Sequence, residues 1–162
     1  MTTPVPSTGT SPTTRRRVIL LASAVWTAYR QRVILLAFAA WTAYVWASRI
    51  VNALGSDTES TGEKAFSVVL SLVLLALTAG VVTVVIRSWK APLTAGGAKV
   101  LAAAAGVTIV VWLIRVPQIL MTDRTMGFKV VHALLGAVSI GLAALVWRIG
   151  RPALRTEGDG RR

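Results

Sequence analysis

Residues 66–86, FSVVLSLVLLALTAGVVTVVI, contain no charged side chain. A helix of this length rises roughly 31 Å at about 1.5 Å per residue, which is enough to cross a hydrocarbon core of about 30 Å. Three other apolar stretches have comparable lengths, at 33–54, 100–116 and 128–147. These stretches have neither the period-two alternation nor the short length of barrel strands, so we predict an all-α membrane protein with four transmembrane helices.

The overall composition agrees with this prediction and excludes several classes of protein. Of the 162 residues, 54% are hydrophobic and only 15% are charged, against roughly 25% charged residues in soluble domains. The chain has no cysteine and one histidine, which excludes disulfides, thiolate metal sites and a bis-histidine haem within one chain. Serine-hydrolase, zinc-protease and nucleotide-binding motifs are missing from the sequence. We therefore expect neither enzymatic activity nor a cofactor.

The distribution of Lys and Arg predicts the orientation in the membrane. Of the 18 basic residues, 13 flank the spans on one side, in the N-terminal flank, the loop 87–99 and the C-terminal flank. The positive-inside rule assigns that side to the cytoplasm. We predict a multi-pass protein of the plasma membrane with both termini cytoplasmic. The net charge of +12 then favours contact with anionic lipids of the cytoplasmic leaflet and requires no nucleic acid.

The segments outside the spans divide the chain further. Residues 1–14, MTTPVPSTGTSPTT, have too little apolar surface to fold and are predicted to form a disordered tail. Residues 32–150 form the predicted four-helix transmembrane domain. Residues 151–162 are predicted to form a basic cytoplasmic tail.

A short duplication precedes the first span. The string RVILLASAVWTAY at 17–29 recurs as RVILLAFAAWTAY at 32–44. The first copy is too short to cross the membrane alone, and one span through both copies would bury Arg30 and Arg32 at about 3 kcal/mol each. We therefore predict that residues 15–31, a duplicate of 32–46, form a helix that lies at the cytoplasmic interface or extends the first span. The alternative is register switching, in which either copy enters the membrane.

A second, more divergent repeat spans the domain. Residues 45–57 align with residues 111–123 at an offset of 66, with Val, Trp, Arg, Leu and Asp identical. After each loop the chain resumes with a similar motif, FSVV at 66–69 and FKVV at 128–131. Each copy contains two spans, so the copies have the same orientation. We predict two tandem helical hairpins related by a parallel duplication.

This second repeat contains the candidate site. In each copy, Trp and Arg lie three residues apart on one helix face, as Trp46 with Arg49 and Trp112 with Arg115. One interpretation is membrane anchoring, with indoles in the interfacial belt and arginines reaching headgroups. The other is a polar pair that binds loop carboxylates or an anionic ligand. The candidate cluster comprises Arg49, Asp57, Arg115, Asp123 and His132, and the candidate interfacial anchors are Trp46, Trp89, Trp112 and Trp147.

His132 lies about one turn into the fourth span. With no second histidine and no carboxylate inside any span, we expect it to form an interhelical hydrogen bond rather than to relay protons or bind haem. The missing carboxylate also argues against a proton-coupled exporter. Trp41 and Tyr44 lie near the centre of the first span, and we expect their face to point inward because the Tyr hydroxyl needs a partner.

Small residues recur at every fourth position on three spans. These stripes favour close helix packing within the chain, and a spare stripe could bind another membrane protein or a second copy. The stripes are Ala39, Ala43 and Ala47; Ala98, Ala102 and Gly106; and Ala133, Ala137 and Gly141.

The strings WTAYVWASRIVNALGSD and MGFKVVHALLGAVSIGLAALVW, with the Ala-, Val- and Arg-rich composition, resemble small uncharacterised four-helix integral membrane proteins of high-GC, actinobacterial-type bacteria. The resemblance covers about residues 32–150. It implies a plasma-membrane location and no assigned activity. Our main hypothesis is an accessory or scaffolding component of a larger membrane complex. The alternative is a small-solute or lipid transporter or channel that uses an outward polar cavity at Arg49, Arg115 and His132.

Overall fold

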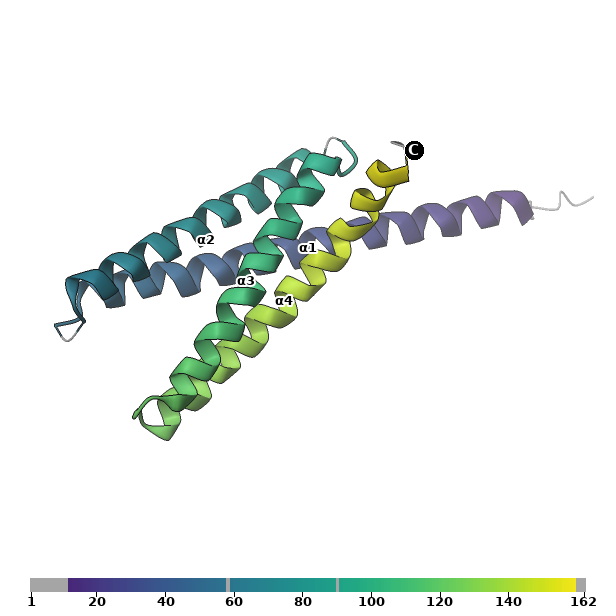
Figure 1. Cartoon of the computed structure of the whole chain (residues 1–162). Coiled ribbons are helices and arrows are strands. Elements are labelled where there is room, and N and C mark those ends of the chain that lie inside the picture. Colours follow the sequence, from purple (N-terminus) through teal and green to yellow (C-terminus); the bar gives the residue numbers. More distant parts are fainter. Residues whose placement is uncertain (1–11, 58, 90, 160–162) are drawn as a thin grey trace, which may run out of the picture. The chain divides into compact units, whose positions relative to one another are not determined.

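A computed structural model describes residues 12–57, 59–89 and 91–159. These residues form four α-helices (Figure 1). The helices are α1 (Pro12–Leu54), α2 (Thr61–Arg87), α3 (Ala95–Met121) and α4 (Met126–Asp159). Each helix contains a segment long and apolar enough to cross a membrane, and the described residues contain no strand. The predicted all-α, four-helix membrane fold is confirmed.

The chain divides into two compact units, residues 1–32 and 33–162. In the first unit, residues 12–32 are helical and belong to α1. The predicted disordered tail is therefore wrong for Pro12–Thr14, and its remaining residues lie outside the described part. Proline suits the first turn of a helix, because the N–H that it lacks would have no helical partner there. The helix predicted at 15–31 is present, and α1 continues without a break to Leu54.

The other helices also exceed the apolar stretches that predicted them. α2 begins five residues before Phe66, where Ser60 and Glu63 form a reciprocal capping box. α3 continues through Pro117 to Met121, beyond the end of the predicted span at residue 116; prolines are tolerated in transmembrane helices. α4 continues through Pro152 to Asp159, so most of the predicted basic tail is helical.

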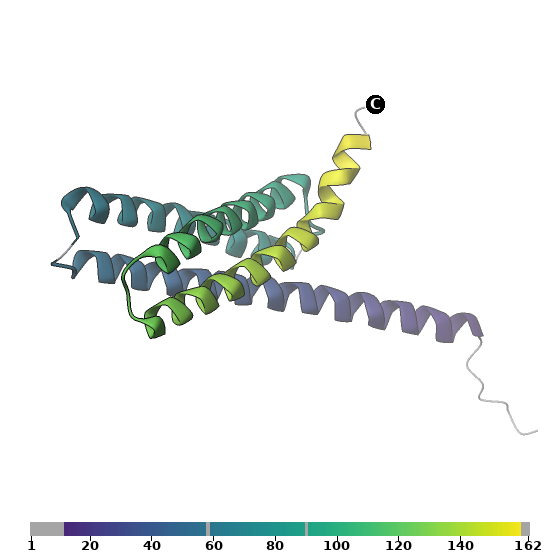
Figure 2. The same cartoon turned by 60° about the horizontal axis from the view of Figure 1, so that its bottom comes forward.

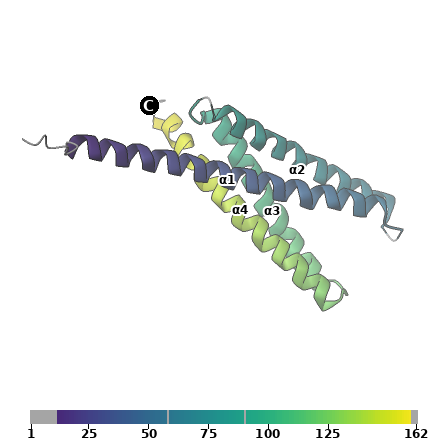
Figure 3. The same cartoon turned by 180° about the vertical axis from the view of Figure 1, so that it is seen from behind.

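Within residues 33–162 the helices form two antiparallel hairpins, with α1 beside α2 and α3 beside α4 (Figures 2 and 3). α3 also contacts α2. The core is made of aliphatic side chains and one phenylalanine. Its buried members are Leu35, Phe38, Val81, Val84, Val85, Leu101, Ala104, Ala105, Ala143 and Val146. The core therefore draws on all four helices.

The small-residue stripes are used unequally. Ala39 and Ala98 are buried, whereas Ala137 and Gly141 on α4 are exposed. Among the glycines of α4, Gly136 has the least space around its Cα, and it is not part of the predicted stripe. A Cβ added there would lie 2.6 Å from Val116 Cγ2 and 3.0 Å from Trp112 Cε3. Gly136 thus lets α3 and α4 pack closely.

The interior also contains hydroxyl side chains that bond mainly to their own helices. Ser71 Oγ donates to the Ser67 carbonyl, and Ser139 Oγ donates to the Leu135 carbonyl, both at 2.7 Å. Ser139 in turn accepts a hydrogen bond from Trp41 Nε1 at 2.9 Å, which links α1 to α4. Trp41 therefore faces inward as predicted. Tyr44, three residues later, is 67% exposed, so the prediction that its side chain is buried is wrong.

Candidate functional site

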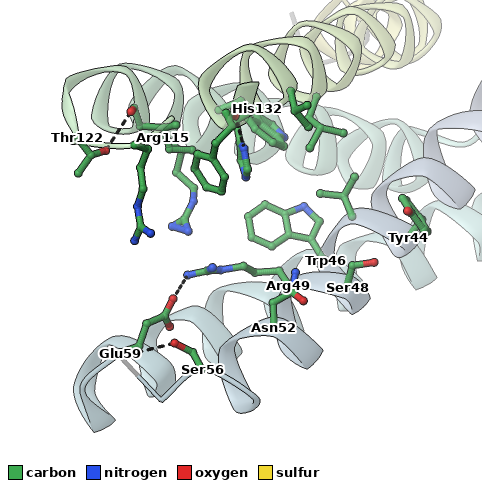
Figure 4. A pocket seen from close by; sticks show the side chains of 17 residues that line it. Tyr44, Trp46, Ser48, Arg49, Asn52, Ser56, Glu59, Arg115, Thr122 and His132 are labelled. Carbon is green, nitrogen blue, oxygen red and sulfur yellow. Dashed lines mark hydrogen bonds and ion pairs between the residues drawn. The ribbon is translucent and has the colours of Figure 1, made fainter. Parts of the chain in front are cut away.

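A pocket of about 680 Å³ lies among α1, α3, α4 and the turns at 55–60 and 122–125 (Figure 4). We call this end of the bundle the turn end. The polar wall of the pocket consists of Ser48, Arg49, Asn52, Ser56, Glu59, Arg115, Thr122, Arg124 and His132. Its apolar wall consists of Tyr44, Val45, Trp46, Trp112, Ile119, Phe128, Val131 and Leu135. Pockets of this size commonly bind small molecules.

Arg49 lies on the last turns of α1 and is held by two partners. Its Nη2 donates to Glu59 Oε1 at 3.1 Å and to Ser67 Oγ at 2.9 Å. The ion pair is about one-quarter to one-third exposed, at 31% for the Arg49 side chain and 25% for Glu59. Arg49 is thereby anchored both to the turn and to α2.

The acidic partner of Arg49 corrects the expected ion pair with Asp57. Asp57 is exposed and does not line the pocket. Glu59 is turned inward because the chain reverses direction between α1 and α2, and its backbone N–H donates to Ser56 Oγ at 3.3 Å. Sequence reasoning missed Glu59 because the repeat alignment ended at Asp57. The capping box at Ser60 and Glu63 fixes the start of α2. This motif was the feature of the sequence that could have shown where the turn ends.

Arg115 has a different environment. It is half-buried on α3 and extends toward the Arg49–Glu59 pair (Figure 4). Among the described residues it forms no hydrogen bond or ion pair, and the expected pair with Asp123 is not formed. It is repelled by Arg49 and attracted by Glu59. Arg115 is thus a cation without a contacting carboxylate.

Trp46 and Trp112 connect α1 to α3 beneath these arginines. They are only 3% and 5% exposed, and their ring centroids lie 6.5 Å apart with the planes at 56°. This corrects their assignment as interfacial anchors, since both indoles pack inside the bundle. Trp89 and Trp147, the other two candidate anchors, are exposed. Residue spacing placed Trp and Arg on one face but left open whether that face points to lipid or to a neighbouring helix.

His132 lines the pocket but does not bridge helices. Its Nδ1 lies 2.9 Å from the Phe128 carbonyl one turn earlier on α4, so Nδ1–H is the donor. Its ring contacts the Phe128 ring at a centroid distance of 3.9 Å. The predicted interhelical hydrogen bond is therefore replaced by one within α4. In the neutral ring, Nε2 remains available as an acceptor.

The pocket has an excess of positive charge and of hydrogen-bond donors. Three arginines and one glutamate line it, which gives a net charge of +2 with His132 neutral. Arg49 Nε and Trp112 Nε1 are buried donors without an acceptor, and Glu59 Oε2 is a buried acceptor without a donor. The described residues contain no cluster of His, Asp and Glu that could hold a metal ion. This chemistry suits an anionic group.

No protein-family model, curated protein or solved structure matches this chain. The pocket is therefore the feature of this chain that bears on its function. Three members of the predicted polar cluster, Arg49, Arg115 and His132, meet there. Asp57 and Asp123 do not line it, and the sequence analysis did not single out Glu59 or Arg124, which do.

Proposed function

We propose that this chain is a non-enzymatic, multi-pass membrane protein that binds an anionic ligand in the pocket at the turn end. The observation that carries the proposal is Arg115, a half-buried residue that has no contacting carboxylate among the described residues and lies beside an Arg49 that is already paired. A guanidinium removed from water loses solvation that only an anion or good acceptors replace. Arg also binds carboxylate and phosphate through two parallel hydrogen bonds.

The location of the pocket in the cell is part of the proposal. The Lys and Arg distribution favours a plasma-membrane protein with cytoplasmic termini. The turn end would then face the outside, and the pocket would take its ligand from the extracytoplasmic medium or the outer leaflet. The basic flanks would contact anionic lipids on the cytoplasmic side.

The test is anion-dependent stabilisation of the purified full-length chain in a neutral detergent. Inorganic phosphate should raise the thermal midpoint progressively with concentration, because a ligand that binds the folded state stabilises it by mass action. Sodium chloride at equal ionic strength controls for screening. Arg115→Gln should remove most of the phosphate effect, whereas Arg148→Gln, at the opposite end of α4, should keep it. An equal response in all three proteins would contradict the proposal.

Transport is the extension of this proposal that the sequence analysis anticipated. If the pocket is a binding site on a transport path, Arg49→Gln, Arg115→Gln and His132→Gln should each abolish anion flux into vesicles while protein abundance stays unchanged. Flux that persists in all three variants would mean that transport does not use the pocket.

The second candidate function is that of an accessory component of a larger membrane complex. Ala137 and Gly141 on α4 are exposed, and a Cβ added at Gly141 would meet no atom of this chain within 4 Å. A helix of a partner protein or of a second copy would pack closely against such a surface. A photo-crosslinking residue at Ala137 should capture a stoichiometric partner in native membranes, and Gly141→Leu should reduce the yield. Crosslinks to lipid alone would contradict this function.

A further inference from the structure

We infer that the ligand of the turn-end pocket is a lipid phosphate, with its head between Arg115 and Arg49 and its hydrocarbon part against Val45, Val131 and Leu135. This inference deepens the proposed anion binding and rests on it. Three features of the pocket support it: the order of its lining residues, the unequal environments of the two arginines, and the amount of positive charge.

The lining changes from polar to apolar along the bundle axis. On α1, Asn52 lies near the turn and Val45 lies seven residues deeper, about 10 Å along the helix. On α4, Arg124 precedes the helix, and Val131 and Leu135 lie progressively farther from the turn. Along its own helix or turn, each arginine of the pocket thus lies nearer the turn than the deepest apolar residues, which are Val45 on α1, Trp112 on α3 and Leu135 on α4. A small inorganic anion would use only the first part, whereas an amphiphile would use both.

The two arginines are at equivalent positions of the predicted repeat but differ in their hydrogen-bond and ion-pair partners. Arg49 has Glu59 and Ser67 as partners. Sixty-six residues after Glu59 stands Thr125, and the position aligned with Ser67 after the second loop is Lys129. The second copy thus lacks both groups that satisfy the arginine in the first copy. Arg115 is therefore the principal anion contact, and Arg49, fixed by its own partners, is the second.

The charge of the pocket matches a phosphate better than a carboxylate. Arg115, Arg49 and Arg124 outweigh Glu59 by two charges. A phosphate monoester carries about −1.5 to −2 at neutral pH and has three acceptor oxygens. A carboxylate supplies one charge and two oxygens. The Trp46–Trp112 pair lines the pocket on the side of the bundle interior, and the apolar contact for the first methylenes of a lipid would come from the more exposed Val45, Val131 and Leu135.

The experiment compares three probes on the full-length chain in neutral detergent by native mass spectrometry and calorimetric titration. The probes are dioctanoyl phosphatidic acid, dioctanoyl phosphatidylcholine and inorganic phosphate. We expect phosphatidic acid to bind at least roughly tenfold more tightly than the other two, since apolar burial adds to the charge-assisted contacts. Arg115→Gln should weaken phosphatidic acid binding by roughly tenfold or more, and Arg115→Lys should weaken it less because the charge is kept.

A matched pair of apolar variants tests the position of the lipid chain. Leu135 lines the pocket, whereas Leu134 is 61% exposed and does not. Leu135→Asn should weaken phosphatidic acid binding several-fold and leave phosphate binding unchanged, while Leu134→Asn should change neither. Variants that fold are identified by a helical circular-dichroism spectrum that matches the wild type and by a monodisperse elution profile.

The outcomes separate this inference from the proposed function. If phosphate and phosphatidic acid bind equally and Leu135→Asn has no effect, the lipid inference is overturned and anion binding stands. If phosphatidic acid binds equally well to wild type, Arg115→Gln and Arg115→Lys, its association is non-specific partitioning, and the inference also fails. If no probe binds in an Arg115-dependent way, both the inference and the proposed function fail.

Discussion

The indole rings of Trp46 and Trp112 lie 6.5 Å apart, although 66 residues separate them along the chain. That separation is the offset of the predicted repeat, so equivalent residues of the two hairpins contact each other inside the bundle. Each indole lies three residues before an arginine of the pocket, Arg49 or Arg115. The aromatic contact therefore holds together the segments of α1 and α3 that carry the two arginines.

This contact predicts energetic coupling between the two tryptophans. Aromatic pairs contribute about 0.5–1.5 kcal/mol beyond their buried area, so Trp46→Leu and Trp112→Leu together should cost less than the sum of the single changes. A double-mutant cycle on unfolding in mixed micelles measures the difference. Pairing Trp46→Leu with Trp147→Leu, which is exposed, is the control and should be additive. Additivity in both cycles would mean that the ring contact contributes nothing to stability.

The two arginines should affect stability in opposite directions. Arg49→Gln leaves Glu59 without its cation and should lower the free energy of unfolding by about 1–3 kcal/mol. Arg115→Gln removes a cation that Arg49 repels and that has no contacting carboxylate, and should leave the ligand-free chain as stable or more stable. Thermal unfolding without added anion makes the comparison. The double variant Arg49→Gln, Glu59→Gln should recover part of the loss, and a loss for Arg115→Gln as large as that for Arg49→Gln would contradict the assigned environments.

The sequence was sufficient for the fold because charge and apolar length alone select transmembrane helices. Their ends were predicted less well, since apolar stretches mark only the part suited to lipid. α2, for example, begins at its capping box, before the first residue of the apolar run. Pro117 directly follows the predicted third span and Pro152 lies in the predicted tail, yet both lie inside helices. Proline removes one hydrogen bond, and near a helix end that loss does not stop the helix.

The site was predicted in part. The repeat identified Arg49 and Arg115, because a charge at the end of an apolar span is conspicuous. It did not identify Glu59, since the conformation of a six-residue turn decides which of Asp57 and Glu59 faces the arginine. The orientation of Trp46 and Trp112 was also misjudged. A tryptophan near the end of a span suits both the lipid interface and a helix contact, and only the packing of the helices distinguishes the two.

Gly136 should be the glycine on α4 that is least tolerant of a larger side chain. A Cβ there would lie 2.6 Å from Val116 Cγ2, so Gly136→Ala forces α3 and α4 apart at the level of Trp112. Overpacking of this kind costs about 1–3 kcal/mol. Gly141→Ala on the same helix meets nothing within 4 Å and should be neutral or slightly stabilising through helix propensity. Similar thermal midpoints for the two variants would show that the helices accommodate the methyl group.

The two copies of the short duplication should differ in their contribution to the core. Phe38, in the second copy, is 1% exposed and belongs to the core, and the equivalent residue in the first copy is Ser23. Phe38→Ser should therefore destabilise the chain by about 3–5 kcal/mol, the range for truncating a buried aromatic side chain. Ser23→Phe should have little effect on stability. If Ser23→Phe restored the stability lost in Phe38→Ser, the first copy would be able to replace the second, as register switching requires.

The orientation predicted from Lys and Arg can be tested directly, because the chain has no native cysteine. Single cysteines at Asp57 and Asp123, which are exposed in the two turns, should react with a membrane-impermeant maleimide in intact cells. A cysteine at Gly96, which is exposed in the first turn of α3 on the side that the rule assigns to the cytoplasm, should react only after permeabilisation. The reverse pattern would place the pocket on the cytoplasmic side. Its anion would then come from the cytoplasm or the inner leaflet, while the chemistry of Arg49 and Arg115 would be unchanged.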